Sequence, residues 1–218
     1  MEEKKGLKYY LVEKKYGKLS FGKLFKKILI VFLIIYTPIA VAAFISNALT
    51  KSDKYAAIFL SADAITGYDH YAPPVAFLGS YPSWTFYFNS KGLKTDFIFS
   101  ATKKDFFDVL YDDKYQSIVL VGHGSFNSWK ATDEYIDNIE IMRHLGKFKK
   151  KKGEWFQLTC PTPDFSKVHL GELVMEDRKP FYYNGDYAGN IDFVWDALLG
   201  FQHLKAEAAE RERMKNVK

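Results

Sequence analysis

The hydrophobic pattern of the chain begins with one long apolar segment. Residues 28–50, ILIVFLIIYTPIAVAAFISNALT, run for 23 positions without a charged side chain. An α-helix of about 20 apolar residues crosses a hydrocarbon core of about 30 Å, and a single proline such as Pro38 is tolerated there. The segment exceeds the apolar region of a signal peptide, although AVAA (40–43) also fits a cleavage site. We predict a transmembrane helix over 28–50.

The pattern changes after this segment to short apolar runs that alternate with helical spacing. Strands are predicted at 55–61, 95–101, 117–124 and 154–160, and helices at 102–113, capped by Thr102, and at 131–148. Such alternation is typical of a parallel sheet with helices on both faces. We therefore predict an α/β domain over 51–204, with a mostly parallel sheet flanked by helices, and a charged tail over 205–218.

Two parts of the domain give a weaker pattern. The stretch 67–92 contains Pro73, Pro74 and Pro82, which predicts broken structure with at most a short helix at 83–90. Beyond residue 160 the pattern allows a helix at 166–176, a strand with the turn NGD (184–186) and a helix from about residue 190.

Charge is distributed unevenly along the chain. Residues 1–27 carry nine Lys against three Glu, whereas the remainder carries 22 basic and 23 acidic residues. A nucleic-acid-binding domain would carry its basic excess on the folded part, so no nucleic-acid partner is expected. Basic residues beside a span stay in the cytoplasm. We therefore predict a single-pass membrane protein with a cytoplasmic tail (1–27) and its main domain on the other side.

Two residues that could carry chemistry each follow an apolar run. His123 ends SIVLVGHG (117–124) and Cys160 ends EWFQLTC (154–160). Adjacent parallel strands lie about 4.8 Å apart, and reactive groups of α/β sheets gather beyond the carboxyl ends of the strands. The imidazole and the thiol are therefore predicted to share one crevice.

Cys160 is the only cysteine in the chain. It excludes an internal disulfide and a Cys-based zinc site, so the thiol is buried and inert, bonded to another chain, or reactive. The remaining histidines show no metal-binding spacing; they are His70, His144, His169 and His203. Neither a metal nor another cofactor is expected.

An apolar strand ending in His-Gly, then a helix, then an apolar strand ending in Cys resembles the catalytic pattern of caspase-like cysteine peptidases. The match is IVLVGHG (118–124) with WFQLTC (155–160), and His123 and Cys160 are 37 positions apart. The similarity covers residues 93–160 closely and the rest of the domain loosely. It implies a caspase-like fold and a peptide or protein substrate.

The resemblance also implies roles for individual residues. Cys160 would be the nucleophile and His123 the acid and base. The backbone N–H groups of Gly124 and Cys160 would form an oxyanion hole, and Asp164 could line a pocket for a basic substrate side chain. The chain departs from the family around the cysteine, where Thr159 precedes it and PTPD (161–164) follows. The domain is also short for the family.

Two other interpretations compete with a membrane-anchored endopeptidase. A catalytically inactive caspase-like domain could act as a membrane-tethered protein-binding module. Alternatively, both residues could be structural, because a cysteine that ends an apolar strand is commonly a small buried hydrophobe. The separation of the imidazole and the thiol discriminates between these interpretations.

Overall fold

The structure is a computed structural model that describes residues 21–61, 72–159, 168–176 and 181–184, with four single positions closer to the C-terminus. The chain divides into two compact units, Met1–Ala42 and Ala43–Lys218.

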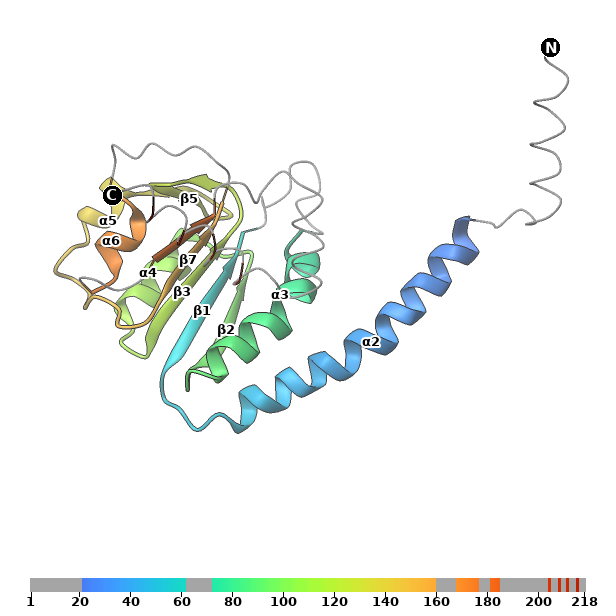
Figure 1. Ribbon diagram of the computed structural model, residues 1–218. Coiled ribbons are helices and arrows are strands. Elements are labelled where there is room, and N and C mark those ends of the chain that lie inside the picture. The colour runs from blue at the N-terminus through green and yellow to red at the C-terminus, as the bar shows by residue number, and fades with distance from the viewer. Residues whose placement is uncertain are drawn as a thin grey trace, which may run out of the picture. The chain divides into compact units, whose positions relative to one another are not determined.

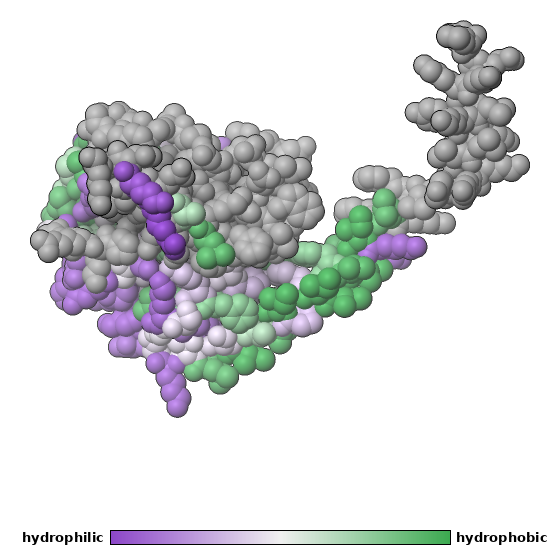
Figure 2. Space-filling view, in the orientation of Figure 1, coloured by the Kyte–Doolittle hydropathy of each residue, from purple (hydrophilic) through white to green (hydrophobic). Residues whose placement is uncertain are grey.

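Helix α2 (Phe21–Leu49) contains the long apolar segment and includes Pro38. Its stretch Lys26–Leu49 is long and apolar enough to cross a membrane, and only 6% of it is buried. Figure 2 shows apolar residues along this helix. A helix that exposes apolar side chains all round has no polar face to turn toward water. The predicted apolar helix is therefore confirmed, with its N-terminus seven residues earlier than the sequence pattern indicated.

The second unit is built on one parallel sheet of five strands in the order β2-β1-β3-β7-β8 (Figure 1). All four neighbouring pairs are parallel. The strands are β1 (Tyr55–Leu60), β2 (Lys94–Phe99), β3 (Tyr115–Val121), β7 (Trp155–Leu158) and β8 (Phe181–Asn184). The predicted α/β architecture with a parallel sheet is confirmed; the caspase-like identity remains a prediction.

The two faces of the sheet bury alternate residues of β1, β3 and β7, as the two-residue period of a strand requires. In β3, Val119 and Val121 pack with α3 (Ala72–Asn89) through its residues Trp84 and Phe88. Ile118 and the other alternate positions pack in a second cluster with α4 (Lys103–Tyr111) and α6 (Leu170–Val174). Figure 1 shows α3 on one side of the sheet and α4 and α6 on the other.

Helix α4 begins as the sequence pattern predicted. The Thr102 hydroxyl accepts from the backbone N–H of Asp105, and the Asp105 carboxylate accepts from the Thr102 backbone N–H, which forms a capping box. The predicted apolar stripe of α4 is buried and consists of Phe106, Phe107, Val109 and Leu110.

The expectation of a broken stretch over 67–92 is wrong for residues 72–89, which form the 18-residue helix α3. Pro73 and Pro74 lie in its first turn, where a missing N–H costs no helical bond. Pro82 lies inside the helix, but Trp84 and Phe88 beyond it are fully buried against the sheet. Tertiary packing thus outweighs the local cost of the proline.

The predicted helix over 131–148 is also wrong for most of its length. The structure has three short antiparallel strands, β4 (Gly124–Ser125), β5 (Ser128–Lys130) and β6 (Tyr135–Asp137), followed by α5 (Asn138–Met142). Asp137 caps α5 by accepting from the Glu140 N–H. Ile136 is buried from a strand, whereas Ile139 and Met142 are exposed. These three residues therefore have helical spacing in the sequence but do not form one buried helical face.

The last turns of α2 belong to the second unit and pack on its edge strand β2. The Asn47 side chain accepts from the Thr95 N–H at 2.8 Å and donates to the Thr95 carbonyl at 3.1 Å. Ala43 is fully buried, and the Ser46 hydroxyl lies 2.9 Å from the Asn89 amide. One side-chain amide therefore satisfies backbone groups that an edge strand otherwise leaves open.

Candidate active site

The candidate site lies beyond the carboxyl ends of β1, β3 and β7. The strand order reverses between β1 and β3, because the chain passes from β1 to β2 on one side and then to β3 on the other. Ligands of open α/β sheets bind at such reversals. Pairing continues past the strands: the Ser61 N–H donates to the Val121 carbonyl at 3.3 Å, and the Gly122 N–H donates to the Leu158 carbonyl at 3.2 Å. The sheet therefore fixes the residues that follow it.

Two glycines with positive φ flank His123. Gly122 has φ +138° and Gly124 has φ +155°, values that L side chains rarely adopt. A Cβ at Gly122 would lie 2.9 Å from the Ser61 Cβ, and one at Gly124 would lie 2.4 Å from the Ser128 carbonyl. The backbone can follow this path only because neither position carries a side chain. His123 is half-buried between them, and its Nε2 atom is shielded from solvent.

The hairpin β4–β5 is anchored to the sheet by two buried side chains. The Gln157 amide donates to the carbonyls of Ser125 and Ser128. The Trp129 ring is fully buried, and its Nε1 donates to the Val121 carbonyl at 3.4 Å. These contacts hold the segment after His123 against the ends of β3 and β7.

The hairpin ladder sets the direction of the Gly124 N–H. Lys130 donates its backbone N–H to the His123 carbonyl at 2.9 Å, and Gly124 pairs with Trp129 at the next position. Hydrogen-bonded and non-hydrogen-bonded pairs alternate along an antiparallel ladder. Gly124–Trp129 is therefore a non-hydrogen-bonded pair, and the Gly124 N–H points away from β5.

Two buried hydroxyl groups lie at the same end of the sheet. Ser61 follows β1 and Thr159 follows β7, and both residues are fully buried. Within the described part of the chain, neither hydroxyl has a hydrogen-bond partner. Buried polar groups without a partner are uncommon and costly. The sequence reasoning missed both residues, although each directly follows an apolar run, which is the signal that singled out His123.

The structure describes only part of the predicted site. His123 and Gly124 lie at the carboxyl end of the sheet, as predicted. Cys160 and Asp164 fall outside the described residues. Thr159, the residue before Cys160, lies against Gly124: a Cβ on that glycine would be 3.1 Å from the Thr159 Cγ2. The residue that follows His123 and the residue that precedes Cys160 therefore meet at the carboxyl end of the sheet.

No metal site is formed by the residues that the structure describes, because they contain no group of three or more His, Cys, Asp or Glu side chains able to hold an ion. The site is instead built from an imidazole, hydroxyl groups and backbone amides. These are the groups used for proton transfer and for binding a carbonyl oxygen.

The sequence matches no known protein-family model, and the search of curated proteins finds no significant relative.

Proposed function

We propose that the chain is a membrane-anchored cysteine endopeptidase of the caspase-like type, with a Cys160–His123 dyad. The observation that carries this proposal is the contact of Thr159 with Gly124. It brings the segment that leads into the cysteine beside the His-Gly segment, at the end of the sheet where α/β domains bind ligands.

In the proposed reaction His123 accepts the thiol proton of Cys160. The thiolate sulfur forms a bond to the carbonyl carbon of the scissile peptide, and the C–N bond then breaks as His123 returns the proton to the leaving amine. Water, deprotonated by His123, hydrolyses the thioester and restores the thiol. A free thiol has a pKa of about 8.5, so at neutral pH the nucleophile depends on a nearby base.

The carbonyl oxygen of the substrate would accept hydrogen bonds from the backbone N–H groups of Gly124 and Cys160. The direction of the Gly124 N–H, away from β5, supports its part in this role. Asp164 remains our candidate for recognition of a basic substrate side chain.

The localisation is proposed from α2 and the distribution of charge. The helix would span the membrane once, with residues 1–27 in the cytoplasm and the α/β domain on the opposite side. Nine lysines before the span, against Lys51 and Lys54 shortly after it, support this orientation.

The test compares the full chain with its Cys160→Ala variant in detergent micelles or vesicles. We expect the wild type to cleave a mixture of fluorogenic peptides and to be labelled by a peptidyl vinyl sulfone, and the variant to do neither. Thr159→Val is the matched control, because it keeps the thiol and the volume while it removes the neighbouring hydroxyl; it should still be labelled.

Two results would contradict the proposed peptidase. If the wild-type thiol is not labelled and no peptide is cleaved, while the full chain still captures peptides, the site belongs to a non-catalytic binding module. Labelling that is equal in the wild type and in His123→Ala would show that the imidazole does not activate the thiol.

A further inference from the structure

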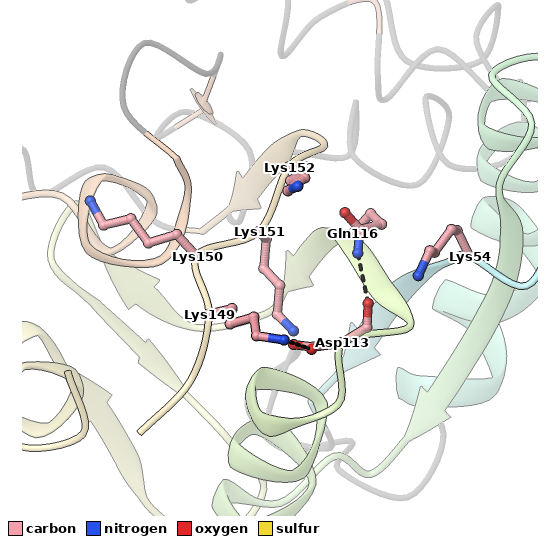
Figure 3. Close-up of a pocket in the computed structure, with 7 residues that line it drawn as sticks. All are labelled: Lys54, Asp113, Gln116, Lys149, Lys150, Lys151 and Lys152. Carbon is pink, nitrogen blue, oxygen red and sulfur yellow. Dashed lines mark hydrogen bonds and ion pairs between the residues drawn. The ribbon is translucent and has the colours of Figure 1, made fainter. Parts of the chain in front are cut away.

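A basic cavity lies at the opposite, amino-terminal end of the sheet. Its volume is about 200 Å³, and Figure 3 shows the residues that line it. They come from the segments that lead into β1, β3 and β7 and comprise Lys54, Asp113, Gln116, Lys149, Lys150, Lys151 and Lys152. The run Lys149–Lys152 forms one wall of this cavity.

Lys151 is the fixed element of the cavity. Only 2% of its surface is exposed, and its Nζ donates to the Asp112 carbonyl at 2.9 Å. Its backbone is held on both sides, because its N–H donates to the Val174 carbonyl and its carbonyl accepts from the Glu176 N–H. Burial lowers the pKa of Lys151 to about 8. Burying a charged ammonium group is energetically costly unless an anion lies next to it.

The lining residues include five lysines and one carboxylate, so positive charge is in excess. The Asp113 carboxylate is occupied by an ion pair with Lys149. Figure 3 shows Lys54 and Lys151 reaching toward Asp113 and Gln116 from opposite sides, whereas Lys150 points away. An anion between Lys54 and Lys151 would therefore contact two ammonium groups from separate segments.

The cavity also lies close to the end of the apolar helix. Four residues separate Leu49, the last residue of α2, from Lys54. Five steps of at most about 3.5 Å keep the Cα atoms of these two residues within about 17 Å of each other. The contact of Asn47 with Thr95, in the second residue of β2, places the helix end at the same amino-terminal end of the sheet.

We propose that this cavity binds a phosphate group, supplied by the headgroup of an anionic phospholipid or by a soluble phosphate compound. Lysine is a common phosphate ligand and acts as a point charge. The binding site is independent of the proposed peptidase reaction, and only its lipid source depends on the proposed membrane span.

The experiment measures binding to the full chain in a neutral detergent at physiological salt by calorimetry. The probes are inorganic phosphate, dihexanoyl phosphatidylglycerol and, as the uncharged-headgroup comparison, dihexanoyl phosphatidylcholine. The test variant is Lys54→Gln/Lys152→Gln, in which both residues are exposed, so that folding is preserved. The matched control is Lys104→Gln/Lys130→Gln, which removes the same charge away from the cavity.

We expect at least one anionic probe to bind, with an affinity at least 10-fold weaker in the test variant and unchanged in the control. Tighter binding of phosphatidylglycerol than of phosphate assigns the lipid source, and the reverse order assigns a soluble one. Absence of binding by both anionic probes, or equal weakening in both double variants, overturns the proposal. Cys160→Ala should bind the probes as the wild type does. The binding result therefore does not depend on whether the peptidase proposal is correct.

Discussion

The two ends of the parallel sheet differ in the chemistry that they present. The carboxyl end has an imidazole, two buried hydroxyls and a glycine backbone around His123. The amino end has five lysines around Asp113. The first set suits proton transfer and the binding of a carbonyl group, whereas the second suits an anion. The same strands therefore support a candidate reaction site and a candidate phosphate-binding site.

Strand β3 connects the two ends and sets the distance between them. It contains seven residues, and at about 3.3 Å per residue it separates the ends by about 20 Å. Effects of substitutions more than about 10 Å apart are usually additive. We therefore expect a substitution at one end to leave the function of the other end unaffected.

The largest expected effect is on activity at the carboxyl end. His123→Ala removes the proposed acid and base, so kcat/KM for peptide cleavage should fall by about 10³-fold, within the range measured for such groups. His144→Ala is the control, because His144 contacts Tyr111 on the far side of α4 and should leave the rate unchanged. Phosphate binding should be the same in both variants.

A substitution that lowers phosphate binding together with cleavage would contradict the independence of the two ends. Equal rates in His123→Ala and the wild type would remove the imidazole from the proposed reaction.

The second effect concerns the backbone after His123. In Gly124→Ala the new Cβ would lie 2.4 Å from a backbone carbonyl, at a φ of +155°. We expect the free energy of unfolding to fall by about 3 kcal/mol, the scale of local backbone strain combined with steric overlap. Gly92→Ala is the matched control, because Gly92 has φ +75° with no atom within 4 Å of the new Cβ. It should cost about 1 kcal/mol.

Chemical denaturation of the full chain in micelles measures both values. Equal losses in the two variants would show that the close approach of the hairpin to Gly124 does not constrain the site.

The third effect is a pH dependence at the amino end. The folded-state pKa of Lys151 is lowered to about 8, first by burial, while its unfolded value is about 10.4. Between these values the unfolded chain binds more protons, so the Lys151 contribution makes the wild type more stable as pH rises from about 8 to about 10.4. The stability of Lys151→Met relative to the wild type should therefore decrease by about 2 to 3 kcal/mol across this window.

Thermal unfolding of both proteins from pH 7 to pH 11 measures that difference. The comparison removes the contribution of Tyr115, whose pKa is raised by burial and by its hydrogen bond to Asp96. Saturating phosphate should flatten the dependence, because an anion next to Lys151 favours its charged form. A constant difference across the window would contradict the buried ammonium.

The central part of the sheet could be predicted from the sequence because β1, β3 and β7 are buried on both faces. Residues 56–60 and 117–121 are apolar or small at almost every position and are almost all fully buried. Such strands give uninterrupted apolar runs. The position of His123 follows from the same pattern, since a residue just beyond a run lies at the carboxyl end of its strand.

The parts that could not be predicted depend on contacts between distant segments. Helix α3 persists through Pro82 because Trp84 and Phe88 pack on the sheet. The segment after His123 forms a hairpin because Gln157, 32 residues from Ser125, binds its backbone. Lys151 resembles its exposed neighbours in the sequence, and the segments that contain Asp112 and Val174 enclose it. Local patterns contain no information about these partners.

The smallest expected effect lies at the edge of the sheet next to the apolar helix. Asn47→Ala removes two hydrogen bonds to the backbone of Thr95, each worth about 1 kcal/mol net. Amide exchange in β2 should therefore accelerate by about 10- to 30-fold in the full chain, because local opening becomes easier by that free energy. Ser52→Ala is the control, since its hydroxyl bonds only to Lys54 nearby. If exchange in β2 is equal in the two variants, the helix end does not hold the edge strand, and the placement of the basic cavity close to the end of the apolar helix loses one of its two supports.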